Sequence, residues 1–364
     1  MRRFDYFLYG DCPVEICADN PRAWFDAETD AILTEIVKSK PGRCDCSAVE
    51  ERFSAKRIEN LIQIGLLRRE NDALWLDSPV LLEEDVAAIE NGMAECVARM
   101  AQLVLNGRSA IEKTVKKLQN GFSVEENLYH LLCAATFDGH FFDLLFERGV
   151  VSTSRRHESG LDYLIIVYEK SPVLERFSRK LLCSYNRMTD GARALQSFGD
   201  SDGNRKDFYR FNSLRASKRL EDSAILRAWN ELPEQNFAQK MLDAAEDLAN
   251  VGECDSKRAW LLEQFGYTSG GKLAVPVYRS ADLACVSDLT ALMDEYLYEE
   301  MRSAIAEKTG LVCAAHDVAA GEIANEMYHI AFGMLNERLI RSGFAATPRE
   351  YPGEGRYLKS IQLK

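Results

Sequence analysis

The side chains of two histidines are the best candidates in this sequence for acid–base or metal chemistry. His130 follows Tyr129 and His329 follows Tyr328, at positions that match when the two segments are aligned. Glu326 precedes His329 by three residues, which is the ligand spacing of carboxylate metal sites on bundle helices. Such a site needs a second helix with carboxylates, and none can be identified. We therefore expect each histidine to form a hydrogen bond at an interface between structural units.

The common catalytic motifs are missing from the sequence. It contains no Walker loop, GxSxG, HExxH or CxxC motif, and no GxGxxG that follows a strand. Cys44 and Cys46, with Cys12 and Cys17, form one alternative redox or metal group. The ten cysteines are scattered along the chain without a secretory signal, which favours free thiols. We therefore expect no catalytic residue, no cofactor and no metal, and a protein that is not an enzyme.

A pattern of elements recurs four times and would position these side chains. Each copy is a helix that ends Leu-x-x-x-Gly, followed by an apolar residue, a polar turn and an apolar strand. The four glycines are Gly65, Gly149, Gly266 and Gly343. A glycine just past the last turn of a helix adopts the left-handed cap conformation at little cost. Four such copies predict a repeated structural module.

The second and fourth copies also agree in register. Tyr163 follows Gly149 by fourteen positions, and Tyr357 follows Gly343 by fourteen. Arg155 in the second copy then matches an arginine at position 349 in the fourth. The agreement predicts a tandem duplication, with one half at residues 26–168 and the other at residues 220–364.

The first copy has the helices of a known DNA-binding fold. Residues 31–37 show helical apolar spacing, a short helix begins at Ser47 with a capping box to Glu50, and a third helix runs from Ser54 to Gly65 before a hairpin. Over residues 28–80 the sequence resembles the winged helix-turn-helix superfamily of transcription regulators. The resemblance is weaker in the later copies, and it implies that the third helix is a recognition helix.

That recognition helix and the wing after it carry residues suited to DNA contact. Arginine, asparagine and glutamine can bind base edges, and lysine and arginine can bind phosphates. The predicted contacts are Lys56, Arg57, Asn60, Gln63, Arg68 and Arg69. Glu59, Glu70 and Asp72 lie among them, so a solvated helix face is the alternative.

A second basic segment lies between the two halves. Its positive side chains are Arg205, Lys206, Arg210, Arg215, Lys218 and Arg219. They alternate with Phe208, Tyr209 and Phe211, a combination that can bind nucleic acid by phosphate contact and base stacking. The alternative is a packed linker whose charges pair with acidic neighbours. The net charge of −12 lowers the expectation of nucleic-acid binding for the whole chain.

These patterns predict a mainly α protein with small β-hairpins, of the α+β class, built from repeated winged-helix-like units in two duplicated halves. Long helices are expected at 83–105 and 283–308, and a further helix from Val173 to about Leu195. The expected divisions are an N-terminal extension (1–25), a winged helix-turn-helix (26–82), a linking helix with a second unit (83–168), a linker helix with the basic segment (169–219), a degenerate third unit (220–280), and a linking helix with a fourth unit (281–364).

The function that follows is that of a DNA-binding transcription regulator whose duplication imitates a dimer within one chain, with double-stranded DNA as partner. The first alternative is a winged-helix scaffold that binds another protein. The second is a ligand sensor with a pocket between the halves, lined by Tyr129, His130, Tyr328 and His329. No apolar run reaches the 18–20 residues, roughly, that a bilayer requires, so we expect a cytoplasmic protein without membrane contact.

Overall fold

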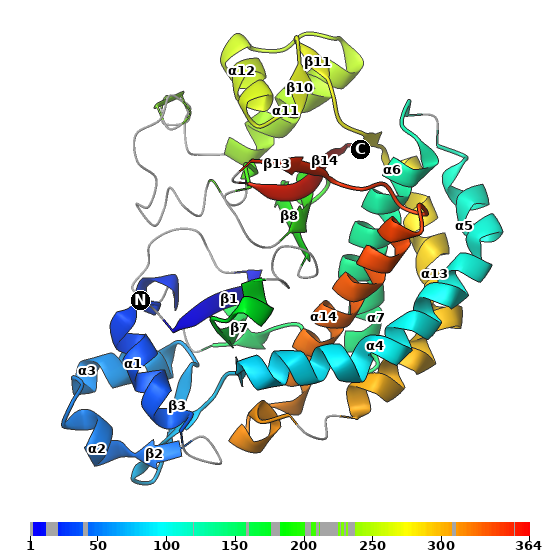
Figure 1. Ribbon diagram of the computed structural model, residues 1–364. Coiled ribbons are helices and arrows are strands. Elements are labelled where there is room, and N and C mark those ends of the chain that lie inside the picture. Colours follow the sequence, from blue (N-terminus) through cyan, green and yellow to red (C-terminus); the bar gives the residue numbers. More distant parts are fainter. Residues whose placement is uncertain are drawn as a thin grey trace. The chain divides into compact units, whose positions relative to one another are not determined.

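The fold is seen in a computed structural model of the whole chain (Figure 1). The structure describes residues 3–11, 21–38, 43–118, 120–157, 160–175, 183–200, 205–208, 237–307, 311–352 and 354–364, with the single residues 211, 225, 227, 228 and 231. Helices predominate and the class is α+β, as the sequence predicts. Within the described residues, no helix combines the length and the apolar character that crossing a membrane requires.

The chain divides into two compact units that do not coincide with the two halves of the sequence. Unit 1 comprises residues 1–100, 142–177 and 297–334, and unit 2 comprises residues 101–141, 178–296 and 335–364. Each unit therefore contains a segment from the other half. The division falls within the three long helices α4 (Glu83–Asn106), α13 (Ser280–Ala306) and α14 (Ala320–Arg341), and also directly after Phe141. The helices α4 and α13 correspond to the two long helices expected from the sequence.

Residues 26–82 of unit 1, here called module 1, form three helices and a small sheet (Figure 1). The sheet has the strand order β2-β4-β3 and is antiparallel. A 3-10 turn, η1 (Pro21–Trp24), precedes the module. Its elements are α1 (Ala27–Ile36), β2 (Arg43–Asp45), α2 (Cys46–Glu50), α3 (Ala55–Gln63), β3 (Leu67–Glu70) and β4 (Ala73–Leu76).

Local hydrogen bonds define where these helices begin. Asp26 caps α1 and Ser54 caps α3, each side chain accepting from backbone amides of the first turn. The second helix begins earlier than expected, because Asp45, and not Ser47, is its N-cap residue. Asp45 lies at the end of β2, so its carboxylate reaches the amide and hydroxyl of Ser47.

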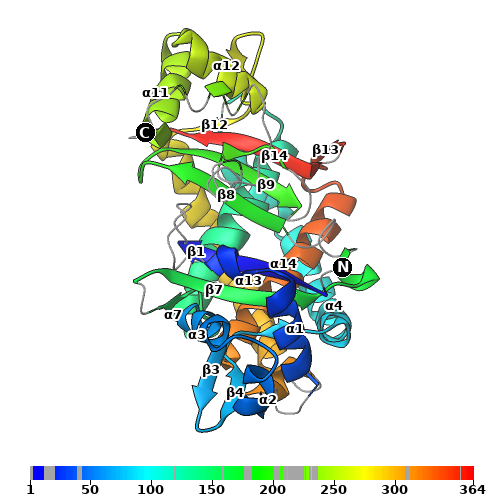
Figure 2. The ribbon, with the colours of Figure 1, turned by 90° about the vertical axis from the view of Figure 1, so that its left-hand side faces the viewer.

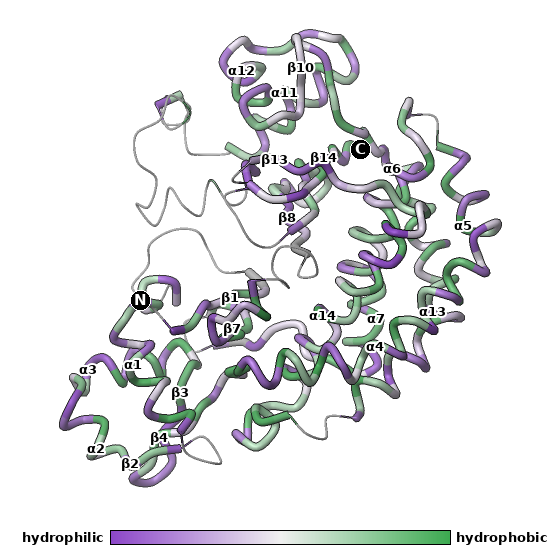
Figure 3. The backbone as a smooth tube through the Cα atoms, viewed as in Figure 1, coloured by the Kyte–Doolittle hydropathy of each residue, from purple (hydrophilic) through white to green (hydrophobic). Residues whose placement is uncertain are grey.

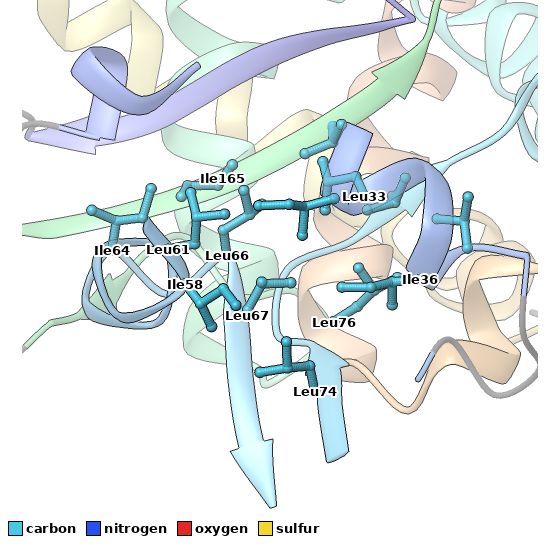
Figure 4. Packing of buried hydrophobic residues seen from close by; sticks show 14 of the residues in the cluster. Leu33, Ile36, Ile58, Leu61, Ile64, Leu66, Leu67, Leu74, Leu76 and Ile165 are labelled. Atoms are coloured by element: carbon cyan, nitrogen blue, oxygen red, sulfur yellow. The ribbon is translucent and has the colours of Figure 1, made fainter. Parts of the chain in front are cut away.

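The interior of module 1 is continuous with the large sheet of unit 1. Figure 4 shows Leu33 of α1, Ile58 of α3 and Leu74 of β4 pointing toward one another, with Ile165 of β7 above them. In Figure 3 hydrophobic stretches of α1 and α3 lie toward this interior, and hydrophilic stretches lie on the outer side of α3. Burial of this shared core is what holds the module against the sheet.

The large sheet of unit 1 has the order β1-β7-β5, and β6 also pairs with β7. The strand β7 is buried on both faces, as expected for a strand covered on each side. Ile165 and Val167 pack on module 1, whereas the next residue, Tyr168, faces α14. The elements are β1 (Phe4–Asp11), β5 (Val80–Leu81), β6 (Arg155–Arg156), β7 (Asp162–Glu169), α7 (Phe141–Glu147) and the short η3 (Cys313–His316).

The sheet of unit 2 has the order β12-β14-β9-β8, with β13 paired to β14 (Figure 2). Its strands are β8 (Cys183–Thr189), β9 (Ala194–Asp200), β12 (Val277–Tyr278), β13 (Arg349–Tyr351) and β14 (Gly355–Gln362). The helix predicted from Val173 to about Leu195 is therefore wrong from residue 183 onward. Residues 183–200 form a hairpin, because β9 pairs along β14 and every residue of β9 is buried.

Unit 2 also contains a helical pair with a short hairpin, here called module 2 (residues 237–278). Its elements are α11 (Phe237–Asn250), α12 (Ser256–Gln264), β10 (Thr268–Ser269) and β11 (Lys272–Leu273). The remaining helices of the unit are α5 (Arg108–Val115), α6 (Val124–Leu128) and the π-helical η2 (Tyr129–His140). The core of module 2 continues into β14 through Ile361, and Leu363, directly after the strand, also belongs to it.

The strands β7 and β14 have the same pattern of neighbours. Arg155 pairs with Tyr163 in unit 1, and Arg349 pairs with Tyr357 in unit 2. On the other side, a short parallel strand pairs with each, β5 at Val167 and β12 at Ile361. All four glycines of the repeated pattern are left-handed, with φ between 69° and 75°, which confirms the predicted caps.

Candidate interaction surfaces

The third helix of module 1 exposes three of the residues expected to contact DNA. Lys56 and Gln63 are exposed, and Asn60 is half-buried. The inner face of the same helix is fixed by Ile58 and Leu61, which are fully buried. The helix therefore presents a polar outer face, as the sequence pattern indicates.

Arg57 was expected on the exposed face, and the structure corrects this. Its side chain is 7% exposed and turns toward the start of α1. The guanidinium donates to the carboxylate of Asp26, to the hydroxyl of Thr29 at 2.8 Å and to the carbonyl of Trp24 at 3.1 Å. It also lies over the ring of Trp24. Arg57 therefore ties two helices of the module together and is not available to a phosphate.

The two arginines of the β3–β4 hairpin are engaged by carboxylates. Arg68 pairs with Glu70 at 2.8 Å and with Asp317 at 2.9 Å. Arg69 pairs with Glu50 at 3.0 Å and with Glu59 at 2.9 Å. Glu59 lies on α3 itself, so the acidic side chains that interrupt the basic pattern in the sequence neutralise its charges in the structure.

The outer surface formed by α2, α3 and the β3–β4 hairpin is therefore close to neutral. Among the residues of this surface that are not buried, the basic ones are Arg43, Arg52, Lys56, Arg68 and Arg69, and the acidic ones are Asp45, Glu50, Glu51, Glu59, Glu70 and Asp72. Non-specific DNA affinity depends on the number of phosphates that lysine and arginine neutralise. A surface with this composition lacks the positive potential that such binding requires.

The helix α12 of module 2 matches α3 of module 1 residue by residue. This match was not predicted from the sequence. The run Lys-Arg at 56–57 recurs as Lys257 and Arg258, Gln63 recurs as Gln264, and the glycine follows at the same distance. Ser54 and Asp255 cap the two helices in the same way, by accepting from the arginine amide. The sequence could have revealed the match, because the equivalent lysines, glutamines and glycines of the two helices are all separated by the same number of positions.

The matching helix α12 exposes the equivalent positions. Lys257 and Gln264 are exposed, like their counterparts on α3. Lys257 pairs with Glu231 at 2.6 Å, so its charge is also matched by a carboxylate. Trp260 replaces the glutamate at the position of Glu59, which makes the face of α12 more apolar than that of α3.

Each of these helices ends on a side-chain donor from the large sheet of its unit. In unit 1 the Tyr163 hydroxyl donates to the carbonyl of Ile64 at 3.0 Å. In unit 2 the ammonium of Lys359 donates to the carbonyl of Phe265. Burial lowers the pKa of Lys359 to about 8. The free carbonyls at the end of a helix need such partners when they are buried, so the sheet orients both helices.

In unit 1, His329 is enclosed by aromatic rings. The ring centroids of Tyr9 and Phe142 lie 4.8 Å and 5.0 Å from that of His329. Nδ1 of His329 lies 2.8 Å from the carbonyl of Asn325, one turn earlier on α14. Glu326 accepts from the Tyr168 hydroxyl, and burial raises the pKa of this carboxyl. The pair that resembled a metal motif is a hydrogen-bonded core cluster.

In unit 2, His130 is likewise buried. The rings of Tyr129 and Tyr278 lie at 6.1 Å from its ring. Burial lowers the pKa of His130 to about 3, so its imidazole is neutral at physiological pH. The hydroxyl of Tyr278 donates to Asn127, which stands at the position of Glu326. Neutral, packed side chains of this kind serve as core residues.

The four residues predicted to line one ligand pocket belong to different units. Tyr129 and His130 lie in unit 2, and Tyr328 and His329 lie in unit 1. Each pair is buried within its own unit. In the described part of the chain, no group of histidines, cysteines and carboxylates has the arrangement of a metal site.

The basic segment of the sequence is only partly described. Arg205 is 2% exposed and pairs with Asp207 at 3.0 Å, so at this position the basic patch is not exposed and the alternative of a packed, paired charge applies. Lys206 is exposed and pairs with Glu354 at 3.4 Å. Arg210, Arg215, Lys218 and Arg219 lie outside the described residues, as do Cys12 and Cys17. Cys44 and Cys46 are free thiols, and burial raises the pKa of each.

Comparison with known proteins adds no relative. No protein-family model, no curated protein and no solved structure matches the chain.

Proposed function

We propose that the chain is a tandem duplication of a winged-helix module joined to a sheet, the sheet around β7 in unit 1 and the sheet around β14 in unit 2. The strand order β2-β4-β3, placed around α1, α2 and α3, supports a winged helix in module 1. The common register of β7 and β14 and the common caps of α3 and α12 support the duplication. This proposal rests on topology, which by itself does not define an activity.

We further propose that both modules act as protein-interaction surfaces and that the protein is a non-enzymatic scaffold. The observation that carries this proposal is the pairing of Arg68 and Arg69 with four carboxylates. A near-neutral face with exposed amide and lysine groups suits a polar protein interface better than a phosphate backbone. The inward position of Arg57 removes a further charge from that face.

The experiment that tests this proposal first titrates the protein with a pooled random duplex, by fluorescence anisotropy at low and physiological salt. We expect no binding at protein concentrations below roughly 10⁻⁴ M, since non-specific binding to DNA requires several unpaired cations. The double variant Glu50→Gln, Glu59→Gln frees Arg69 and is expected to gain weak, salt-sensitive binding. Micromolar binding by the wild type that weakens steeply with salt would overturn the scaffold proposal.

A second arm tests the protein partner directly. A photo-crosslinking amino acid is placed at Gln63 or at Gln264 in cells, with the exposed position Glu95 of α4 as control. We expect one and the same protein to be captured from both module positions and not from the control. The captured protein is then purified, and its affinity is measured for the wild type and for variants with a single substitution at Gln63 or at Gln264. Capture of different proteins from the two positions would contradict a shared function of the modules.

A DNA-binding transcription regulator is the second candidate. The observation that favours it is the recurrence of exposed lysine and glutamine at equivalent places, Lys56 with Lys257 and Gln63 with Gln264. Two recognition helices in one chain would imitate a dimer that binds two half-sites. The duplex titration separates the candidates, and replacement of both lysines by alanine then shows whether these helices are responsible.

A further inference from the structure

A buried carboxyl group on the first turn of α14 faces Arg155, which in turn bonds to module 1. Glu322 is 2% exposed, and its Oε1 lies 3.6 Å from Nε of Arg155. This distance is too long for a hydrogen bond. Within the described residues, neither the second oxygen of Glu322 nor Nε of Arg155 has a hydrogen-bond partner. The two groups therefore face each other in the interior of unit 1 without being fully satisfied.

Arg155 connects this carboxyl to the end of α3 and to the end of β4. Its NH2 group donates to the carbonyl of Gly65 at 2.8 Å, directly after α3. Its NH1 group donates to the carbonyl of Asp77 at 3.2 Å and pairs with the Asp77 carboxylate at 3.1 Å. Any change in the charge of Glu322 therefore acts on a guanidinium that already holds the end of α3 and the end of β4.

Two further titratable groups, Asp77 and His157, lie near Glu322 and Arg155. Burial raises the pKa of Glu322 to about 7; Arg155 lowers it and Asp77 raises it. Burial also raises the pKa of Asp77, which Arg155, Arg68 and His157 lower. Burial lowers the pKa of His157, whose ring stacks on Tyr163 at 3.8 Å. One arginine thus serves two acids, the buried Glu322 and the partly buried Asp77, which cannot both be ionised at low cost.

We propose that the protonation of Glu322 controls the packing of the first turn of α14 on Arg155, and through Arg155 on module 1, and that this packing loosens as the pH rises through neutrality. In the protonated form the buried group is neutral, and Arg155 is left to Asp77 and to the carbonyl of Gly65. Loss of the proton creates a second carboxylate next to Arg155 and Asp77, on a side chain that is itself only 2% exposed. The destabilised elements are the first turn of α14 and the segment around Ser152, which bonds to the carbonyl of Gly321.

The direction of the effect follows from linkage. The folded-state pKa of Glu322 lies above the ordinary value of 4.5, so between these values the folded chain binds the proton and the unfolded chain does not. The stabilisation is fully present below pH 4.5, roughly, and is lost as the pH rises through about 7. Between pH 6 and pH 8 the equilibrium for opening this contact should increase by up to about tenfold.

Hydrogen exchange of the whole protein tests the proposal. The amides of Ser152 and Glu322 are followed at pH 6, 7 and 8, with correction for the intrinsic exchange rate. We expect the opening equilibrium of the wild type to rise toward tenfold, and that of Glu322→Gln to stay constant because its side chain cannot ionise. The control Glu95→Gln changes an exposed glutamate of the same unit and should retain the pH dependence of the wild type.

Two results would overturn the proposal. One is a wild-type exchange profile at these amides that does not change with pH after correction. The other is an equal pH dependence in Glu322→Gln. If the glutamine variant fails to fold, carbon-13 NMR of the wild-type glutamate carboxyl groups decides the question. A Glu322 midpoint near 7 supports the proposal, and a midpoint near 4.5 refutes it.

Discussion

Lys56 and Arg57 are adjacent cations with opposite roles. Lys56 is exposed on the outer face of α3, whereas Arg57 is buried and donates to Trp24, Asp26 and Thr29. A guanidinium offers five donors in a planar arrangement, which suits it to a site with several acceptors. At this position the charge stabilises the fold, and only the neighbouring lysine remains for a partner.

Replacement of Arg57 by alanine is therefore expected to destabilise unit 1. The loss of a buried guanidinium with three acceptors should lower the free energy of unfolding by about 2–4 kcal/mol. Lys56→Ala serves as the matched control and should change it by less than about 0.5 kcal/mol. Urea unfolding followed by tryptophan fluorescence provides the measurement. Equal midpoints for the two variants would show that Arg57 is not a structural residue.

At the scale of elements, the end of α3 is the most constrained position of module 1. Gly65 is left-handed, and a β-carbon added there would lie 2.5 Å from Cε1 of His157. His157 cannot easily move, because its ring stacks on Tyr163 and its Nε2 lies 3.1 Å from the Tyr163 carbonyl. Gly149 has nearly the same φ, but open space around its α-carbon.

These two glycines separate backbone strain from steric contact. Gly149→Ala should cost about 1 kcal/mol, which is the price of a left-handed alanine. Gly65→Ala should cost about 2–4 kcal/mol, because the clash with His157 is added. Thermal unfolding of both variants under the same conditions measures the difference. A Gly65→Ala variant no less stable than Gly149→Ala would show that the contact with His157 is loose.

At the scale of the whole molecule, each compact unit depends on both halves of the sequence. Unit 1 includes residues 297–334, and there the α14 residues Glu326 and Tyr328 are fully buried. Unit 2 includes residues 101–141, where Tyr129 of η2 packs against Phe198 of β9. The sheet of either unit would expose a large apolar face without the helix supplied by the other half.

A fragment of residues 1–177 should therefore fail to fold by itself. Expressed alone, it is expected to aggregate or to give poorly dispersed NMR spectra, since the apolar face that α14 covers would be exposed. Coexpression with residues 178–364 should restore a soluble complex of equal stoichiometry. The measurement is copurification with a tag on one fragment. A well-folded fragment 1–177 would contradict the mutual dependence of the halves.

The sequence alone determined the features that depend on local chemistry. The left-handed glycines after the four helices, the cap at Ser54 and the long helices α4 and α13 follow from residue type and periodicity. The outer face of α3 was also predictable at Lys56 and Gln63, because helical spacing places them opposite Ile58 and Leu61. These features need no information from distant residues.

Tertiary structure decided the features that depend on distant partners. Residues 183–200 are strands because β14 supplies the pairing edge, and a periodicity argument cannot detect that edge. Arg57 turns inward because Trp24 and Asp26 offer acceptors more than thirty residues away. The charge of the module surface was likewise settled by which carboxylates reach Arg68 and Arg69. The order of residue types along the chain does not show which side chains pair when they lie far apart in the sequence.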